Sequence, residues 1–260
     1  MNAPESLSSF NLLGVRVSVL NMPLALHTLE RWIEHGERQY VCVANVHTVT
    51  ESTRHPDLRR AMNHAGMVTP DGMPLVWMGL WWGHSSIARV YGPELLRQAC
   101  RFGVPRGWRH YFYGGAPGVA ERLVERLSRE NPGLQVAGVE SPPFRPLTER
   151  EEEELVERVQ VAAPHLFWVG LGAPKQELWM AEHAGKLPVP VMLGVGAAFD
   201  FLAGLKPQAP AWMQRAGLEW LFRLMSEPKR LWRRYLVNNP RFIWLALSQM
   251  LGWWRPPDGD

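Results

Sequence analysis

Two polar residues that could bind a substrate follow a continuous apolar run. Asn45 and His47 come at the end of QYVCVANV (39–46). An Asn and a His at the end of a buried strand can hydrogen-bond a sugar or a base, since ligands of parallel sheets bind beyond the carboxyl ends of the strands. A capping role for Asn45 at the start of the next helix is an equally good interpretation.

A single carboxylate stands in a similar position. Asp71 follows the short apolar run 67–70 within Pro70-Asp71-Gly72. One carboxylate at a strand end suits a general base, because partial burial raises the pKa of such a group towards neutrality. The same tripeptide is common in β-turns, so a purely structural role stays open.

Two glycine-containing junctions could bind an anion. Gly114 and Gly115 lead from an apolar run into a helix, and Gly172 precedes Lys175 and Gln176 at the start of another. Free N–H groups at a helix N-terminus attract phosphate, and a lysine adds a charge. A solvated first helical turn is the alternative for the second junction.

Asp200 is a lone acid between Phe199 and Phe201, where it could bind a ligand, cap a helix or accept a buried hydrogen bond.

Several motifs are missing from the sequence. No junction has the G-x-G-x-x-G of dinucleotide-binding enzymes, and there is no G-x-S-x-G. The nine His have no zinc-ligand spacing. The only D-x-D is Asp258-Gly-Asp260 at the extreme C-terminus, whereas metal-dependent nucleotide-sugar transferases usually need an internal one for Mn²⁺ or Mg²⁺. The sequence therefore offers no metal site and disfavours a nicotinamide cofactor.

Alternating strand and helix patterns must position these residues. Apolar runs typical of strands lie at 15–20, 39–46, 67–70, 110–115, 134–140, 165–172 and 190–196. Helical patterns lie between them, including one over 48–65 broken near Pro56 and one over 148–161 with a Thr148–Glu151 capping box. This alternation predicts an α/β fold with a Rossmann-like, mostly parallel sheet and helices on both faces.

The pattern becomes purely helical in the last fifth of the chain. From Trp212 to Asp260 there are eight Lys or Arg against four acids, and six of the 13 Trp. Arg230, Arg233 and Arg234 fall on one side of a helix. We therefore predict a core over 1–205 and a basic, Trp-rich helical appendage over 206–260 that associates with a membrane surface. An ordinary packed helical subdomain is the alternative.

Other sequence features bound the cellular setting. No apolar run approaches the ~20 residues needed to cross a bilayer, and the N-terminus has no secretory signal. Cys42 and Cys100 lie among apolar neighbours, as free buried thiols do in a reducing compartment. No nucleic-acid partner is expected, and self-association stays open.

Taken in order, these segments resemble the WecG/TagA/CpsF family of bacterial glycosyltransferases (glycosyltransferase family 26). The resemblance covers roughly residues 11–245. The matching stretches are VANVHTVTES (43–52), PDGMPLVW (70–77), RVYGPELL (89–96), YFYGGAPGVAERL (111–123), VGLGAPKQELWM (169–180), GVGAAFDFLAG (194–204) and APAWMQRAGLEWLFRLMSEPKRLWRRY (209–235).

The resemblance implies a metal-independent, inverting hexosyltransferase without a cofactor. Such enzymes move a sugar, typically N-acetylmannosamine, from a UDP-sugar to a polyprenyl-diphosphate-linked acceptor in exopolysaccharide, capsule or cell-surface glycan synthesis. They act from the cytoplasm at the inner membrane, as peripheral proteins whose C-terminal appendage helps to complete the site.

The resemblance also implies roles for individual residues. Asp71 would be the general base on the acceptor hydroxyl, Gln176 would lie near the donor, and Asn45 and Arg89 would line the donor or acceptor pocket. Three arginines of the appendage would supply positive charge to the site: Arg223, Arg230 and Arg233.

Three departures leave the sugar open among N-acetylmannosamine, glucose and related hexoses. Many members have Thr where this chain has Val43, and many have Arg where it has Gln208. His47 stands where some members have an acid, which favours a capsule or exopolysaccharide branch.

Two other function classes compete. One is a nucleotide-linked oxidoreductase or epimerase on a Rossmann-like sheet, against which the missing glycine fingerprint argues. The other is a non-catalytic membrane adaptor whose basic tail binds anionic lipid.

Overall fold

The computed structural model describes residues 7–256 and divides the chain into two compact units. Unit 1 comprises Met1–Met22, Val43–Tyr91 and Gln208–Asp260, and unit 2 comprises Pro23–Cys42 and Gly92–Pro207. Residues 1–6 and 257–260 of these ranges lie outside the described residues. The predicted division into a core and an appendage stays a prediction.

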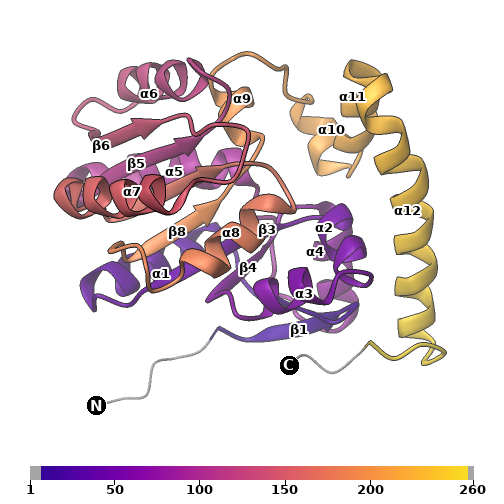
Figure 1. The fold of residues 1–260 in the computed structure, drawn as a ribbon. Coiled ribbons are helices and arrows are strands. Elements are labelled where there is room, and N and C mark those ends of the chain that lie inside the picture. Colours follow the sequence, from indigo (N-terminus) through magenta and orange to yellow (C-terminus); the bar gives the residue numbers. More distant parts are fainter. Residues whose placement is uncertain (1–6, 257–260) are drawn as a thin grey trace. The chain divides into compact units, whose positions relative to one another are not determined.

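A six-stranded parallel sheet confirms the α/β fold class (Figure 1). Its strand order is β4-β3-β8-β7-β5-β6. Strands β3, β5, β7 and β8 are almost entirely buried, which explains why the sequence shows them as continuous apolar runs. The strand over 134–140 is the half-exposed strand β6, at the end of the order.

Unit 2 holds most of this sheet and the helices that alternate with it (Figure 1). Its elements are α1 (Met22–Glu34), β3 (Gln39–Ala44), α5 (Gly92–Gly103), the 3₁₀ helix η1 (Val104–Arg106), β5 (Arg109–Gly114), α6 (Val119–Glu130), β6 (Gln135–Glu140), α7 (Glu149–Ala162), β7 (Leu166–Gly170), α8 (Lys175–His183), β8 (Val191–Gly194) and α9 (Ala198–Leu202). Met22 at the start of α1 and Val43 and Ala44 at the end of β3 belong to unit 1. The predicted Thr148–Glu151 capping box is present at the start of α7.

Unit 1 combines a hairpin, three helices from the first third of the chain and the C-terminal helices. Its elements are β1 (Ser9–Leu12), β2 (Val15–Ser18), α2 (Val46–Ser52), α3 (Pro56–Asn63), β4 (Met67–Pro70), α4 (Met73–Trp81), α10 (Ala211–Arg215), α11 (Glu219–Ser226) and α12 (Pro228–Met250). The predicted break near Pro56 separates α2 from α3, and the purely helical pattern after Ala209 is confirmed.

The strand predicted over 15–20 lies outside the six-stranded sheet. It is β2, which pairs antiparallel with β1 in a sheet of two strands. Leu13 and Gly14 between them both have positive φ, 54° and 91°, which is the geometry of a tight two-residue hairpin turn.

Helix α12 packs on α2 and also contacts α11. Leu231, Tyr235, Phe242 and Ala246 of this helix are buried. The Gln249 side chain accepts a hydrogen bond from the Leu13 N–H at 2.9 Å and donates one to the Asn11 carbonyl oxygen at 2.7 Å. These contacts hold α12 against the rest of unit 1 along most of its length.

Two further expectations concerned the cysteines and the length of the apolar helices. Cys42 and Cys100 are both free and buried. Within residues 7–256, every helix is too short or too polar to span a bilayer.

Candidate active site

Asp71 lies in unit 1 at the end of β4, whose four residues are all buried. Its N–H donates to the carbonyl oxygen of Ala44 at 2.9 Å, which fixes the loop beside the last residue of β3. Gly72 follows as the N-cap of α4. The carboxylate is half-buried. The buried strand and the helix start therefore hold a single carboxylate where the sheet ends.

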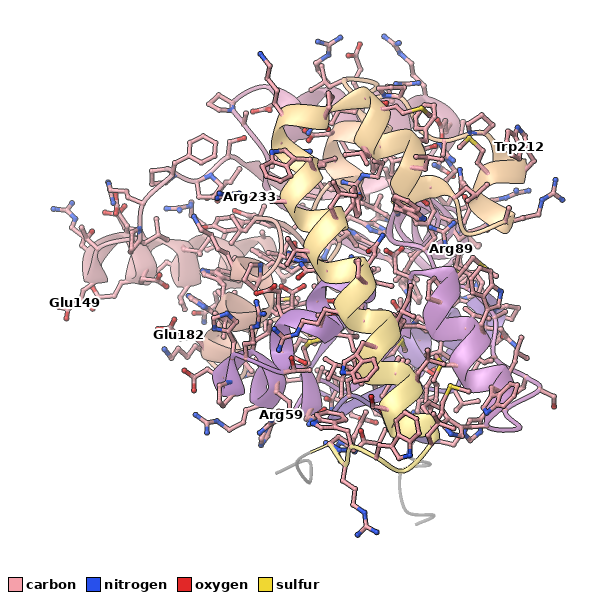
Figure 2. All side chains as sticks on the ribbon, turned by 90° about the vertical axis from the view of Figure 1, so that its right-hand side faces the viewer. Arg59, Arg89, Glu149, Glu182, Trp212 and Arg233 are labelled. Carbon is pink, nitrogen blue, oxygen red and sulfur yellow. The ribbon has the colours of Figure 1, made fainter. Side chains whose placement is uncertain are left out.

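Arg89 connects this loop to the C-terminal helices of the same unit (Figure 2). Its Nε donates to the carbonyl oxygen of Asp71. Its Nη1 donates to Gln214 Oε1 at 3.3 Å, and its Nη2 donates to Glu219 Oε2 at 2.5 Å. Its guanidinium also lies 4.2 Å from the centre of the Tyr91 ring. We call these five residues the Arg89 cluster.

The charges of the Arg89 cluster act on one another. Burial on its own lowers the pKa of Arg89, but the carboxylates of Asp71 and Glu219 outweigh it and hold that pKa above its usual value. Burial raises the pKa of Tyr91, and the same two carboxylates raise it further. Arg223 acts in the opposite direction on Tyr91, so its charge reaches the cluster from α11. A half-buried carboxylate with cations close by is therefore assembled within one unit.

Asn45 is the N-cap of α2, as one of its two interpretations predicted. Its Oδ1 accepts from the N–H groups of His47 and Thr48 at 3.0 and 3.3 Å. A Cβ on Gly72 would lie 3.9 Å from Asn45 Cβ, so Asn45 contacts the loop that carries Asp71. Substrate binding by Asn45 stays a prediction.

His47 links α2 to α12. Its Nδ1 accepts a hydrogen bond from Asn238 Nδ2 at 2.6 Å, and Asn238 is buried. A ligand role for His47 stays a prediction, and the contact gives this residue a structural task as well.

Arg230 and Arg233 lie on the solvent-exposed side of α12. Arg230 forms an ion pair with Glu227, with Nε–Oε2 at 2.5 Å. The guanidinium of Arg233 lies 5.5 Å from the Trp232 ring centre, and Arg233 is labelled on the exposed face of α12 in Figure 2. Their catalytic and binding roles stay predictions.

The remaining predicted residues belong to unit 2. Gly114 has φ 135°, and a Cβ there would lie 2.6 Å from the backbone of Gly170. The N–H of Gly115 donates to the carbonyl oxygen of Gly170 at 3.1 Å. The close approach of β5 to β7 thus explains the glycine at position 114, and the hydrogen bond places Gly115 at the same junction. Their binding of phosphate stays a prediction.

Gln176 is buried and joins two glycine loops. Its Oε1 accepts from the N–H of Gly172 at 3.2 Å, and its Nε2 donates to Glu177 Oε1 at 3.1 Å. A Cβ on Gly194 or Gly196 would lie 3.1 Å from its amide. Gln176 therefore holds the ends of β7 and β8 together from below the surface.

Lys175 is exposed at the first residue of α8. Asp200 forms an ion pair with Lys206, with Nζ–Oδ2 at 2.8 Å. Neither observation tests the predicted binding roles of Lys175 and Asp200.

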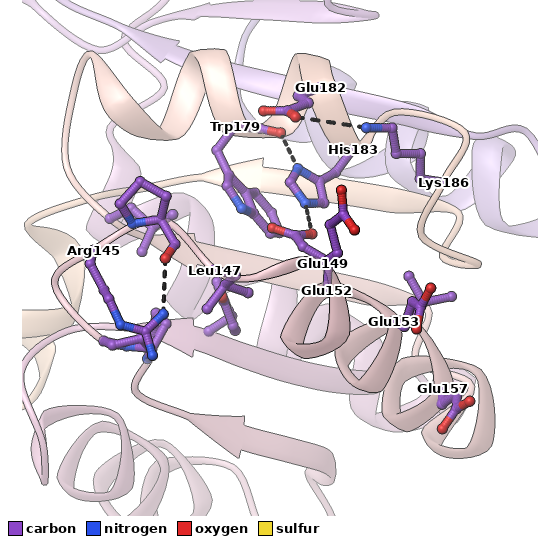
Figure 3. A pocket seen from close by; sticks show the side chains of 16 residues that line it. Arg145, Leu147, Glu149, Glu152, Glu153, Glu157, Trp179, Glu182, His183 and Lys186 are labelled. Carbon is purple, nitrogen blue, oxygen red and sulfur yellow. Dashed lines mark hydrogen bonds and ion pairs between the residues drawn. The ribbon is translucent and has the colours of Figure 1, made fainter.

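A pocket of about 780 Å³ opens in unit 2 beside α7 and α8 (Figure 3). Five glutamates line it: Glu149, Glu152, Glu153, Glu157 and Glu182. Within it both ring nitrogens of His183 are engaged, Nε2 with Glu152 at 2.6 Å and Nδ1 with the Trp179 carbonyl oxygen at 2.7 Å. The site residues predicted from the sequence are not among its lining residues. Its five glutamates outnumber its two permanent cations, Arg145 and Lys186, which disfavours binding of a diphosphate. Within residues 7–256 no three His, Cys, Asp or Glu side chains are grouped as a metal site.

Comparison with known proteins decides the family. The model of the Glycosyl transferase WecG/TagA/CpsF family matches residues 10–256. The chain belongs to this family. It is therefore a glycosyltransferase, as its resemblance implied, and the oxidoreductase and adaptor alternatives have no support.

Curated relatives within this family share about a quarter of their residues with the chain. One from Bacillus spizizenii is 26% identical over 222 residues, covering 85% of this chain and 84% of the relative. One from Bacillus subtilis is 25% identical over 240 residues, covering 89% and 91%. One from Staphylococcus aureus is 26% identical over 205 residues, covering 79% and 78%. All three are named N-acetylglucosaminyldiphosphoundecaprenol N-acetyl-beta-D-mannosaminyltransferase.

Sequence reasoning missed three members of the Arg89 cluster. Tyr91 and Glu219 stand in stretches that carry the family resemblance, RVYGPELL and GLEW, but neither received a role. Gln214 received none either. Their spacing gave no signal, since Arg89 and Glu219 are 130 residues apart.

Proposed function

We propose that this glycosyltransferase transfers N-acetylmannosamine, or a related hexose such as glucose, from a UDP-sugar to a polyprenyl-diphosphate-linked acceptor. The relatives' names support the lipid-linked acceptor and the mannosamine donor. The observation that carries the proposal is the half-buried Asp71 carboxylate in the Arg89 cluster, at the end of a buried strand. In this proposal the Asp71 carboxylate acts as the base and nearby guanidinium groups offset the charge of the leaving diphosphate, so that no metal ion is required.

Asp71 is the general base of the proposed reaction. It removes the proton from an acceptor hydroxyl as that oxygen attacks the anomeric carbon of the donor sugar. The bond between the anomeric carbon and the UDP oxygen breaks on the opposite face, and UDP leaves with the electron pair. One displacement inverts the anomeric centre, and the proton remains on Asp71.

Arginines of the C-terminal helices stabilise the leaving diphosphate in the proposal. UDP gains negative charge on its β-phosphate as the bond breaks, and guanidinium groups offset that charge. Arg223 is the best-supported candidate, because its charge already acts on Tyr91 in the Arg89 cluster. Arg230 and Arg233 are exposed on α12 and would meet the diphosphate from there.

Membrane association through α12 completes the proposal. The side of α12 opposite α2, together with its C-cap Leu251, exposes several large apolar residues: Trp232, Leu236, Val237, Ile243, Trp244, Leu247 and Leu251. Large apolar patches rimmed by cations are typical of helices that lie in a bilayer interface. We therefore propose a peripheral protein on the cytoplasmic face of the bacterial inner membrane, where a lipid-linked acceptor is presented.

A UDP-release screen tests this function. The full chain is incubated with UDP-N-acetylmannosamine, UDP-N-acetylglucosamine or UDP-glucose, with and without a short-chain lipid-diphosphate-N-acetylglucosamine acceptor, in EDTA. We expect acceptor-dependent UDP release from one donor, with the α-linked donor sugar becoming β-linked in the product. Retention of the anomeric configuration, or a need for added divalent cation, would refute the proposed mechanism. No acceptor-dependent release from any donor would refute the function.

A further inference from the structure

Helix α4 is apolar on every side. From Met73 to Trp82 the sequence MPLVWMGLWW has no charged residue, although a fifth of the whole chain is charged. One side of α4 packs in unit 1 through Leu75, Val76, Met78 and Gly79. A charge-free helix in a water-soluble protein is ordinarily buried all round.

The other side of α4 is exposed. Trp77, Leu80 and Trp81 are 48%, 46% and 72% exposed, and their i, i+3, i+4 spacing places them on one face. Three large neighbouring apolar side chains in contact with water mark an interaction surface rather than ordinary scatter. We call them the α4 patch.

The α4 patch adjoins the C-terminal helices. Gly217 lies in the turn between α10 and α11, and a Cβ there would lie 2.6 Å from Trp77 Cη2. The indole of Trp77 therefore touches the backbone of that turn. The two helices that flank the turn carry further exposed apolar side chains, Trp212 and Met225. Figure 2 labels Trp212 at the right-hand edge of the view that has α12 at its centre.

The charge of these helices suits an anionic bilayer. Residues 208–256 contain eight Lys or Arg and two Glu. Tryptophan is enriched at the membrane–water interface, and cations near an interface are attracted to anionic headgroups. Nine residues of helix are about 14 Å long, too short to cross the hydrocarbon, so α4 can only lie in the interface.

We propose that α4 inserts the α4 patch into the headgroup region of an anionic membrane. It is a second lipid-contacting element beside α12, and it lies within the first third of the chain. Asp71 stands two residues before α4, with Gly72 as the N-cap between them. The depth of α4 in the interface therefore sets how far the Asp71 carboxylate lies from the headgroups. The inference rests on the membrane association that the proposed function includes and adds α4 to it. Lipid contact by α4 needs no turnover, so it can fail or hold independently of sugar transfer.

Co-sedimentation with acceptor-free vesicles tests the inference. Full-length protein is mixed with vesicles of equimolar phosphatidylcholine and phosphatidylglycerol, as wild type and as the Leu80→Gln/Trp81→Gln variant. Both positions are exposed, so the fold is kept, and the melting temperature checks this. We expect vesicle binding to weaken about tenfold, because two apolar side chains no longer leave water.

A matched control and a second readout complete the design. Phe144→Gln/Val161→Gln changes two side chains of unit 2 that are 87% and 88% exposed, and its vesicle binding should equal wild type. Transfer to a water-soluble short-chain acceptor should be unchanged in both variants. Wild-type vesicle binding by Leu80→Gln/Trp81→Gln would overturn the inference. If the same variant also changed the molar mass in light scattering, a second copy of the chain would be the occupant instead. A transferase assay that fails for wild type bears on the proposed function alone.

Discussion

Glu219 on α11 accepts a hydrogen bond at 2.5 Å from Arg89, whose Nε also donates to the backbone carbonyl of Asp71. The two side chains of this ion pair are only 16% and 14% exposed. One guanidinium thus joins the loop that carries the proposed base to the helix that carries Arg223. Glu219 is therefore a positioning residue in this account, acting through Arg89.

Glu219→Gln should impair catalysis through that contact. The variant keeps a hydrogen-bond acceptor but leaves the partly buried Arg89 charge without one of its two carboxylates. We expect kcat to fall about tenfold with little change in KM, and the free energy of unfolding to fall by about 1–2 kcal/mol. Steady-state kinetics and urea unfolding measure both.

Glu125→Gln is the matched control for Glu219→Gln. Its ion pair with Arg129 joins two exposed side chains on one helix. Such pairs contribute less than about 1 kcal/mol, so both readouts should stay near wild type. If Glu219→Gln behaved like this control, the Arg89–Glu219 ion pair would have no part in catalysis or stability.

Gln176→Ala should weaken donor binding more than it slows turnover. The side chain is buried and bonds both the Gly172 N–H and Glu177. Its loss leaves buried polar groups without partners and an empty space between two loops, at a cost of about 2–3 kcal/mol. We expect KM for the donor to rise. Gln135→Ala, at an exposed site, should change neither KM nor stability.

The sequence predicted the strands of the parallel sheet because residues buried on both faces form unbroken apolar runs, as in 39–46 and 165–172. It missed the five-residue helix α9, which is too short to show a period. It also missed β1, because Leu13-Gly14 is not one of the dipeptides that signal a tight hairpin.

The residues of the candidate site also divide into those that the sequence indicated and those that it did not. Asp71 stood out because it is a lone carboxylate directly after a buried strand. Glu219 did not, because a glutamate in the first turn of a helix is ordinary and only tertiary structure brings it to Arg89. Which apolar residues of α12 are exposed could be determined only from the structure. The sequence pattern of an apolar helix face is the same whether that face packs on a core or contacts a membrane.

His110 should make the protein acid-sensitive. Burial lowers the pKa of His110 to about 3, with His165 adding to the effect. Stability is full above pH 6.5, the usual pKa of the unfolded form. As the pH falls below 6.5, His110 binds a proton in the unfolded chain but stays neutral in the folded protein. The free energy of unfolding then falls by about 1.4 kcal/mol per pH unit until the pH nears 3.

His110→Asn isolates this contribution. The asparagine Oδ1 stands where Nδ1 does, so it can accept the hydrogen bond from the Trp168 indole N–H, which lies 3.1 Å from Nδ1, but it does not titrate. Urea unfolding of both proteins between pH 7 and pH 4 should show a shallower decline for the variant. Parallel declines would mean that His110 binds its proton equally well in both states.

Asp71→Asn tests the central claim most directly. Transfer to the lipid-linked acceptor and equilibrium binding of UDP are measured in EDTA for wild type, for Asp71→Asn and for the exposed control Asp57→Asn. The account predicts that Asp71→Asn transfers about 10³-fold more slowly while it binds UDP as wild type does, and that the control matches wild type in both. Transfer by Asp71→Asn at the wild-type rate would contradict the account, because a carboxamide cannot take the proton from the acceptor hydroxyl.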